Sequence, residues 1–390
     1  MTKLIHVLLM MVIRTLGCFR TRRKKKRVLR SLWVGHPVLN MGINARAECL
    51  LGIDARSLVF EHDHIRGAFT YDLAKWRRLP IIGRLSPYGV LLWAIWKFDR
   101  FHFYCDRGIL VSPEPFTFNW DELELLKKIK KEVFCWAYGG DVRSRERTES
   151  LGQYNCCMEC PQPGSFCICN KETGDRYAER IRNNTTAVFS MGDMIHYTPG
   201  SINDIFYWPV ELDVESGNKY KPHVPSADST TALCVVHAPN NRAYKGTRFL
   251  MSAVERLQQE GVLIELQLIE NLSNEEALKL YQQADVLFDQ CLIGFHGYTA
   301  QEGMALGKPV ICYIRDPERY LLDSEACPIL SANPDQLEDT LRDLANNRMR
   351  VHQLGAAGRK YIEQHHTPVH FAARLHRAYK QLNVEAGQLP

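Results

Sequence analysis

The sequence predicts an α/β protein built from two doubly wound domains. Its 390 residues exceed what one hydrophobic core usually organises. From Val28 onward, apolar runs with the length of strands alternate with helical patterns, and a second series of this kind begins at Ala232. Between the two series lies the polar, proline-bearing segment SGNKYKPHVPSADSTT, residues 216–231. This segment is the predicted linker.

The composition limits the classes of protein that the chain can belong to. Hydrophobic residues make up 45% and charged residues 24% of the sequence, as in ordinary globular proteins. No apolar run reaches the roughly 18 residues that a membrane-spanning helix needs. The net charge of +5 is too small for a general nucleic-acid-binding surface, and no nucleic-acid partner is expected.

The N-terminus joins an apolar run to a basic run. LIHVLLMMVI, residues 4–13, is followed by RTRRKKKR, residues 20–27. A secretory signal carries its charge before the apolar run, so this order argues against export. The pattern predicts that residues 1–27 form an interfacial helix on an anionic membrane, with the protein cytoplasmic and peripheral at the inner face of the cell membrane. The alternative is a solvated charge run beside a helix that packs on the protein itself.

Residues 28–215 form the predicted first domain. VLRSLWVG is expected to be a strand that ends at Gly35, and a turn at Gly42 is expected to lead into a helix and a second strand over residues 55–60. Gly42 is a candidate ligand-binding residue in that turn. Ligands of open α/β sheets bind at the carboxyl ends of the strands, so Gly35 and the later loop Tyr138-Gly139-Gly140-Asp141 are expected to line a cleft.

The second domain is expected over residues 232–366, and its first strand leads into a basic loop. ALCVVHAP is followed by NNRAYKGT, which places Arg242 and Lys245 three residues apart before a helix. Two cations at a helix N-terminus, with Gly246 allowing close backbone approach, favour the binding of a diphosphate. Two solvated surface cations are the alternative.

The stretch GFHGYTAQEGMALGKPVICYI, residues 294–314, strengthens the case for a nucleotide site. Gly297 permits a tight turn, and the N–H groups of Tyr298 and Thr299 would begin a helix whose positive end faces the same phosphates. Glu302, about one turn inside the helix, can accept two hydroxyl hydrogens from a ribose. A glutamate in this position also stabilises the helix dipole, which is the commoner role of such a residue.

These two segments carry a resemblance. HAPNNRAYKGT followed by GYTAQEGMALGKPVI resembles the second domain of family 4 glycosyltransferases, the retaining GT-B enzymes that build bacterial polysaccharides and glycolipids. The resemblance implies two Rossmann-like domains facing a cleft, with a C-terminal helix, residues 367–390, that crosses back to the first domain. It also implies that Arg242 and Lys245 bind the donor diphosphate and that Glu302 binds the donor ribose.

The sequence departs from the family pattern on the sugar side of the site. Eight positions before the ribose glutamate, the family has an acidic residue that contacts the donor sugar, and here that position is Gly294. Asp289, at the end of the preceding strand, is a candidate substitute. The family's first-domain histidine falls on Tyr138, which can hydrogen-bond a hydroxyl group but is a poor general base near neutral pH.

The resemblance implies a hexosyltransferase that moves a sugar from a nucleotide diphosphate sugar to a glycan or lipid-linked acceptor, with retention of configuration. Arg242, Lys245 and the helix beginning at Tyr298 would stabilise the leaving diphosphate without a metal or other cofactor. A nucleotide-sugar 2-epimerase of the same fold, or a catalytically silent nucleotide-sugar-binding or glycan-binding protein, are alternatives.

A cysteine-rich insertion, residues 154–170, interrupts the first domain. The sequence NCCMECPQPGSFCICN contains a C-x2-C pair and a later C-x-C pair. Four cysteines in this arrangement are candidate ligands of a structural zinc ion: Cys157, Cys160, Cys167 and Cys169. Unligated thiols are an equal alternative, and disulfides are less favoured because the chain shows no export signal.

Overall fold

The computed structural model describes residues 3–18, 28–61, 68–104, 106–203, 209–212, 219–228 and 230–389. The basic run at 20–27 lies outside these residues. The chain divides into two compact units. Unit 1 comprises residues 1–144, 164–207 and 371–390, and unit 2 comprises residues 145–163 and 208–370.

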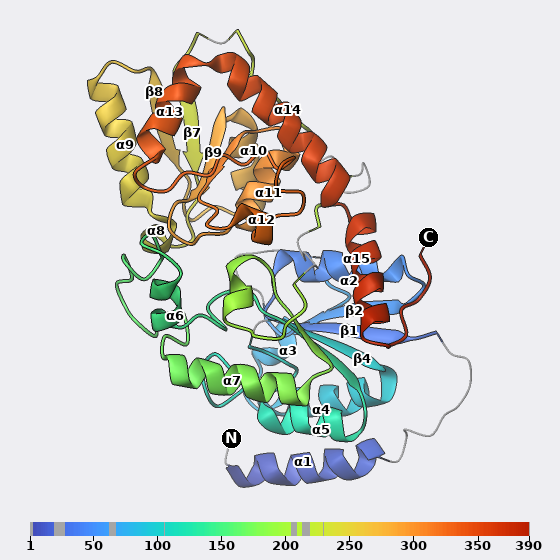
Figure 1. Ribbon diagram of the computed structural model, residues 1–390. Helices are drawn as coiled ribbons and strands as arrows, with labels where there is room; N and C mark the ends of the chain where they lie inside the picture. The colour runs from blue at the N-terminus through green and yellow to red at the C-terminus, as the bar shows by residue number, and fades with distance from the viewer. Residues whose placement is uncertain are drawn as a thin grey trace. The chain divides into compact units, whose positions relative to one another are not determined.

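Unit 1 is built on a parallel sheet with the strand order β3-β2-β1-β4-β5-β6 (Figure 1). Its central strands are buried on both faces, and most of their side chains are apolar; Ser31, Arg100 and His102 are buried polar exceptions. The strands are β1 (Arg30–Gly35), β2 (Asp54–Val59), β3 (Tyr71–Asp72), β4 (Arg100–Tyr104), β5 (Glu132–Trp136) and β6 (Ala187–Phe189). The helices are α1 (Lys3–Cys18), α2 (Leu39–Cys49), α3 (Ala74–Arg77), α4 (Ile82–Lys97), α5 (Trp120–Lys128), α7 (Lys171–Asn184), the 3-10 helix η1 (Gly192–His196) and α15 (Pro368–Gln381).

A buried polar network attaches α15 to the sheet of unit 1. The Tyr379 hydroxyl donates to Glu48 Oε1 at 2.7 Å and is 2.9 Å from His102 Nε2. The other ring nitrogen of His102 accepts from the indole N–H of Trp136 at 3.0 Å. Arg100 lies 3.4 Å from Glu48 and stacks on the Tyr379 ring. Buried polar groups need such partners, and this network therefore fixes the C-terminal helix in unit 1.

Unit 2 has a second parallel sheet with the order β10-β9-β7-β8 (Figure 1). A hydrophobic core packs between this sheet and helices α9 and α13. The strands are β7 (Leu233–His237), β8 (Ile264–Leu268), β9 (Val286–Gln290) and β10 (Val310–Cys312). The helices are α6 (Arg145–Ser150), α8 (Arg242–Lys245), α9 (Thr247–Gln259), α10 (Asn274–Gln283), α11 (Tyr298–Ala305), α12 (Pro317–Tyr320), α13 (Leu337–Asn346) and α14 (Arg348–His365).

Three expected boundaries differ in the structure. Gly42 lies inside α2 rather than in a turn, and it is small because a Cβ atom there would meet the carbonyl oxygen of Ala68 at 2.5 Å. Residues 145–163, which include the first half of the cysteine-rich insertion, group with unit 2 instead of the first domain. The described part of the predicted linker, 219–228 and 230–231, also belongs to unit 2, where Tyr220 is buried.

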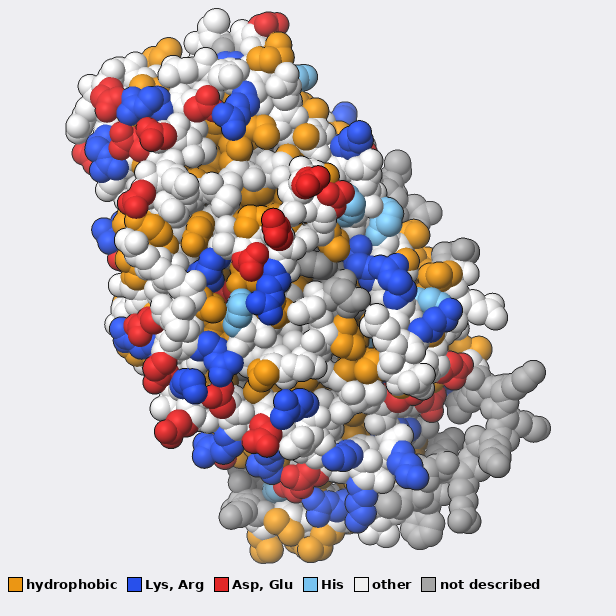
Figure 2. Space-filling view, in the orientation of Figure 1, with side chains coloured by type: hydrophobic (Ala, Val, Ile, Leu, Met, Phe, Trp, Pro, Cys, Tyr) orange, Lys and Arg blue, Asp and Glu red, His pale blue; other side chains and the backbone are white. Residues whose placement is uncertain are grey.

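Helix α1 has one face on the protein and one face in solvent. Met10 and Ile13 are buried in the unit 1 core, where α1 packs along α4. His6 bonds to the Tyr88 hydroxyl at 2.7 Å, and Arg14 pairs with Asp121. The outer face exposes a row of apolar side chains, Leu4, Ile5, Val7, Leu8, Met11, Val12 and Leu16. Hydrophobic side chains gather at the edge of the molecule where α1 lies (Figure 2).

Within the described ranges, no helix combines the length and the apolar character that crossing a membrane requires.

Candidate functional site

The carboxyl edge of the unit 2 sheet, meaning the ends of β7, β8, β9 and β10 with their loops, collects the charged residues that the sequence singled out. After β7, the side chain of Asn241 accepts the Tyr244 N–H and caps α8. Gly246 then adopts a left-handed conformation, φ 75°, which separates α8 from α9. Arg242 and Lys245 stand at the two ends of α8 and form ion pairs with different partners.

Lys245 points inward and forms a buried ion pair with Asp289 at the end of β9. The Asp289 side chain is only 1% exposed and also accepts the backbone N–H of Gly297, the residue that precedes α11. Burial alone would raise the pKa of Asp289, but the Lys245 ammonium and the Gly297 N–H lower it below its ordinary value. Asp289 is therefore an ionised group that positions Lys245 and the start of α11, rather than an unengaged substitute for a sugar-binding acid.

Arg242 points outward and makes a two-pronged ion pair with Glu270, which follows β8. Its Nε donates to Glu270 Oε1 at 2.7 Å, and its Nη2 donates to Oε2. The Arg242 side chain is about half exposed. A diphosphate that binds the Nε and Nη2 edge of Arg242 competes with Glu270. No local pattern indicates this pair, because the two residues lie 28 positions apart.

Glu302 is buried within the first turns of α11 and is 3% exposed. One carboxylate oxygen, Oε1, accepts from Asn274 Nδ2 at 2.9 Å and from the Tyr220 hydroxyl at 3.2 Å. Burial raises the pKa of Glu302, partly opposed by Asn274 and by the charge of Lys219. Among the residues that the structure describes, no hydrogen bond is recorded to Oε2, so this oxygen can accept a ligand hydroxyl.

The carboxyl edge of the unit 1 sheet holds an aspartate in a comparable loop. After β5, Asp141 accepts the backbone N–H groups of Tyr138 at 3.1 Å and Gly139 at 2.5 Å. Burial, together with the negative charge of Asp106, raises the pKa of Asp141 to about 6. Tyr138 is thus held by the loop through its backbone.

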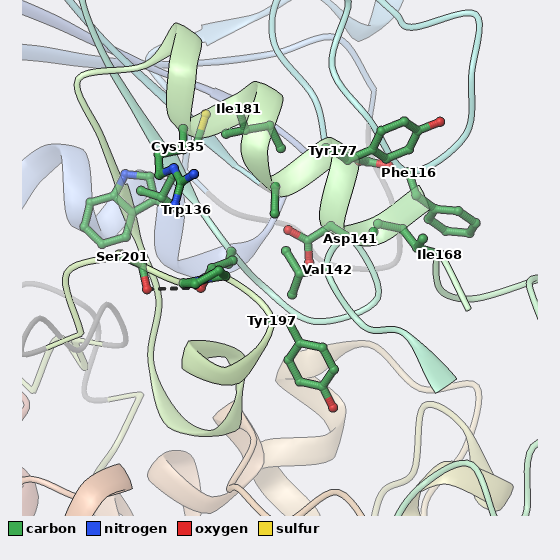
Figure 3. A pocket seen from close by; sticks show the side chains of 18 of the residues that line it. Phe116, Cys135, Trp136, Asp141, Val142, Ile168, Tyr177, Ile181, Tyr197 and Ser201 are labelled. Atoms are coloured by element: carbon green, nitrogen blue, oxygen red, sulfur yellow. Dashed lines mark hydrogen bonds between the residues drawn. The ribbon is translucent and has the colours of Figure 1, made fainter. Parts of the chain in front are cut away.

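A pocket of unit 1 opens beside this loop (Figure 3). Its wall is mainly aromatic and aliphatic, with the carboxylate of Asp141 among the apolar side chains. The lining includes Phe116, Val142, Ile168, Tyr177, Ile181 and Tyr197. Thr198 and Ser201 add hydroxyl groups that hydrogen-bond each other at 3.1 Å. Such a wall suits a ligand with an apolar or flat face and a few polar groups.

Of the four cysteines in the zinc prediction, Cys157 and Cys160 belong to unit 2, and Cys167 and Cys169 belong to unit 1. The described ranges contain no cluster of three or more His, Cys, Asp or Glu side chains arranged to hold a metal ion. Cys160 instead lies 3.3 Å from the Tyr244 hydroxyl within unit 2. Zinc binding therefore stays a prediction, which elemental analysis of the purified protein can test.

Three residues that contact the candidate site residues were not predicted from the sequence: Tyr220, Asn274 and Glu270. Tyr220 lies in the segment predicted as a linker. Asn274 is the first residue of α10, where Ser273 and Glu276 form a capping box. Each contacts a site residue at least 28 positions away, so no local pattern marks them.

The two parallel sheets with their flanking helices define the GT-B fold of glycosyltransferases. Sucrose-phosphate synthase from Thermosynechococcus elongatus is similar in structure, with a TM-score of 0.54, 12% sequence identity, and coverage of 91% of this chain and 99% of that one. Anabaena Alr3699/HepE, solved in complex with UDP-glucose, has a TM-score of 0.53 at 11% identity and covers 90% of this chain and 100% of its own. A glycosyltransferase from Rickettsia africae has a TM-score of 0.52 at 12% identity, over 92% of this chain and 99% of that one.

No family model matches the chain, and no curated protein matches it either.

Proposed function

We propose that the protein is a nucleotide-sugar-dependent glycosyltransferase of the hexosyltransferase type. The observation that carries the proposal is the grouping of Lys245, the N-terminus of α11 and Glu302 at one edge of the unit 2 sheet. The positive charge of Lys245 and the N-terminus of α11 favour the binding of a diphosphate, and Glu302 Oε2 can accept a hydrogen bond from a ribose hydroxyl. HepE, a structural neighbour, was solved with UDP-glucose, which supports a nucleotide sugar as the donor.

In the proposed reaction, the bond between the anomeric carbon and the diphosphate oxygen breaks, and the oxygen of an acceptor hydroxyl bonds to that carbon. The acceptor proton passes to the departing phosphate, so retention of configuration needs no strong protein base. Lys245 and Arg242 stabilise the charge that develops on the diphosphate, without a metal. The aromatic pocket of unit 1 is the proposed binding site for part of a glycan or lipid-linked acceptor.

The experiment incubates purified protein with radiolabelled nucleotide sugars and a membrane lipid extract. Transfer of label to lipid or glycan supports the proposal, isomerisation of the sugar alone supports the epimerase alternative, and binding without either supports a silent binding protein. Glu302→Ala and Lys245→Ala should each cost about 1.5–3 kcal/mol in transition-state or donor binding, as expected for lost hydrogen bonds to charged groups. Exposed residues of like charge, Glu318→Ala and Lys279→Ala, are the matched controls. Unchanged kinetics in both site variants would remove the assignment of the site.

We further propose that the exposed face of α1 rests on an anionic membrane surface at the inner face of the cell membrane. The support is a continuous apolar row on a helix whose other face is fixed to unit 1. Leu8→Glu and Met11→Glu, both on the exposed face, should reduce vesicle flotation while preserving the fold. Thr15→Glu, also exposed on α1, adds the same charge without removing an apolar side chain and is the control. Equal flotation of all variants would contradict the proposal.

A further inference from the structure

The connection between α3 and α4 exposes a cluster of large apolar side chains. Ile81 is 73% exposed and Trp76 is 57% exposed. The other exposed members of the cluster are Leu79, Ile82 and Leu85. We call residues 73–85, which contain the cluster, the α3–α4 hairpin. Monomeric proteins usually expose such side chains singly, so a contiguous group of them indicates contact with another surface.

A tight turn holds the hairpin in shape. The backbone N–H of Gly83 donates to the Leu79 carbonyl at 2.7 Å, and the Arg77 guanidinium donates to the Gly83 carbonyl at 3.4 Å. A Cβ atom at Gly83 would clash with the Arg77 carbonyl oxygen. Of the residues in α3, only Ala74 is buried. The large side chains are therefore exposed on a closed backbone, which a partner that binds them does not have to order first.

The hairpin is also strongly basic. The chain contains no acidic residue between Asp72 and Asp99. Lys75, Arg78 and Arg84 are exposed, and within the described ranges none of the three forms an ion pair. Unpaired cations beside exposed apolar side chains and a tryptophan are typical of protein segments that lie in the interface of an anionic bilayer.

Helix α1 lies next to the hairpin. His6 Nδ1 is 2.7 Å from the Tyr88 hydroxyl, and Leu85 lies about one turn before Tyr88 on α4. At the other end of the contact, the indole N–H of Trp96 donates to the Leu16 carbonyl at 3.3 Å. Helix α1 therefore runs along α4 with its N-terminal end nearer to the hairpin (Figure 1). The exposed apolar row of α1 and the hairpin are neighbouring surfaces of unit 1.

We propose that the α3–α4 hairpin is a second membrane-binding element, which inserts its apolar side chains into an anionic bilayer. Lys75, Arg78 and Arg84 then meet the headgroup phosphates of the lipids. This inference deepens the membrane contact proposed for α1 and does not depend on the transferase activity. Because α3 follows β3, the hairpin lies at the carboxyl edge of the unit 1 sheet, the edge that also carries Asp141. Attachment at two neighbouring elements fixes the orientation of unit 1 on the membrane.

The first test uses Trp76 as a reporter in the full-length protein. The difference in emission between the wild type and Trp76→Phe isolates the signal of this side chain from the other tryptophans. With vesicles of phosphatidylcholine and phosphatidylglycerol, the signal should shift to shorter wavelength and be quenched by brominated lipid. With phosphatidylcholine alone, both effects should be much smaller. Absence of quenching under conditions in which the protein floats with the anionic vesicles overturns the inference.

The second test replaces an apolar side chain of the hairpin. Ile81→Glu should weaken partition into the anionic vesicles at least about tenfold, because it removes an inserted side chain and adds a repelled charge. Leu263→Glu makes the same change at a side chain of unit 2 that is 65% exposed, and is the matched control. Thermal unfolding checks that both variants are folded. Equal partition of the two variants overturns the inference.

The third test removes charge from the hairpin. Arg78→Gln combined with Arg84→Gln should weaken partition into the anionic vesicles at least about tenfold, because each basic side chain near such a surface contributes several-fold. Lys279→Gln combined with Arg319→Gln removes the same charge from exposed positions of unit 2 and is the control. Equal effects of the two pairs overturn the inference, because the attraction would then depend on net charge alone.

Two further outcomes separate this inference from the other proposals. If Leu8→Glu abolishes flotation and Ile81→Glu does not weaken it, α1 alone binds the membrane and the inference is overturned. If the wild type is a dimer by light scattering without vesicles and Ile81→Glu is a monomer, the hairpin is an interface between copies of the chain, which also overturns it. Binding of UDP by calorimetry tests the proposed function separately, since neither hairpin result changes what UDP binding shows.

Discussion

Two aspartates hold loops at the carboxyl edges of the two sheets, and they differ in their charged neighbours. Asp141 in unit 1 and Asp289 in unit 2 each accept the backbone N–H of a glycine, Gly139 and Gly297 respectively. Burial and the charge of Asp106 raise the pKa of Asp141 to about 6. Asp289 is also buried, yet Lys245 lowers its pKa. One lysine thus decides whether such a loop is held by a permanent ion pair or by a carboxyl group that titrates near neutral pH.

The largest effect is expected on stability, from breaking the buried ion pair between Lys245 and Asp289. Lys245→Met leaves Asp289 buried and unpaired, and we expect the free energy of unfolding to fall by about 3–5 kcal/mol in urea denaturation. Adding Asp289→Asn to this variant removes the unpaired charge and should recover part of the loss. Lys279→Met removes an exposed lysine and should change stability by less than about 0.5 kcal/mol. A Lys245→Met variant as stable as Lys279→Met would show that the pair does not hold the edge together.

The two aspartates should give opposite dependences of stability on pH. The folded-state pKa of Asp141 is raised from 3.8 to about 6, so its contribution to stability declines as pH rises through that window. The folded-state pKa of Asp289 is lowered, so its contribution is present above 3.8 and is lost as pH falls.

Urea unfolding from about pH 2.5 to 7.5 can measure this contrast in two matched variants, because the two windows lie on opposite sides of the ordinary aspartate pKa. Relative to the wild type, Asp141→Asn should gain stability as pH rises from 3.8 to about 6, because the amide can still accept the loop N–H groups without ionising. Asp289→Asn should lose stability relative to the wild type as pH rises toward 3.8 from below, with a constant difference at higher pH. Curves that run parallel to the wild type in both variants would contradict the comparison.

A third prediction is that substitutions in unit 1 change the KM for the acceptor, whereas substitutions in unit 2 change the KM for the donor. Phe116→Ala removes a ring from the pocket of unit 1, and we expect the KM for the acceptor to rise about three- to tenfold with the donor KM unchanged. Glu302→Gln should raise the donor KM and leave the acceptor KM unchanged. Phe166→Ala, an exposed phenylalanine of unit 1 outside the pocket lining, is the control for Phe116. If Phe116→Ala changed only the donor KM, the pocket would not be the acceptor site.

The smallest effect is expected on UDP affinity, from breaking the exposed ion pair between Arg242 and Glu270. Glu270→Gln removes the carboxylate that occupies Arg242, and we expect UDP to bind about two- to fivefold more tightly, because an exposed ion pair is weak. Adding Arg242→Gln should cancel the gain. Glu318→Gln, an exposed glutamate elsewhere in unit 2, should leave binding unchanged. Weaker binding in Glu270→Gln would mean that Glu270 positions Arg242 for the phosphate rather than competing with it.

Local patterns were sufficient for much of the fold. Parallel strands buried on both faces are rich in apolar residues, and such runs indicated both sheets and the break between the two series. They failed at Gly42, where the glycine serves close packing against Ala68 rather than a turn. They also failed at residues 145–163 and 219–228, because chain order does not show which unit a connecting segment packs on.

The sequence by itself determined the strands, the glycine-bearing loops and the presence of Lys245 and Glu302 at their ends, because hydrophobic periodicity and backbone conformation are local properties. Only the tertiary structure decided which charges meet. Lys245 pairs with Asp289, Arg242 pairs with Glu270, and the Arg315 side chain lies over Gly294. These contacts depend on the order and register of the strands, which bring together side chains that are far apart in the chain.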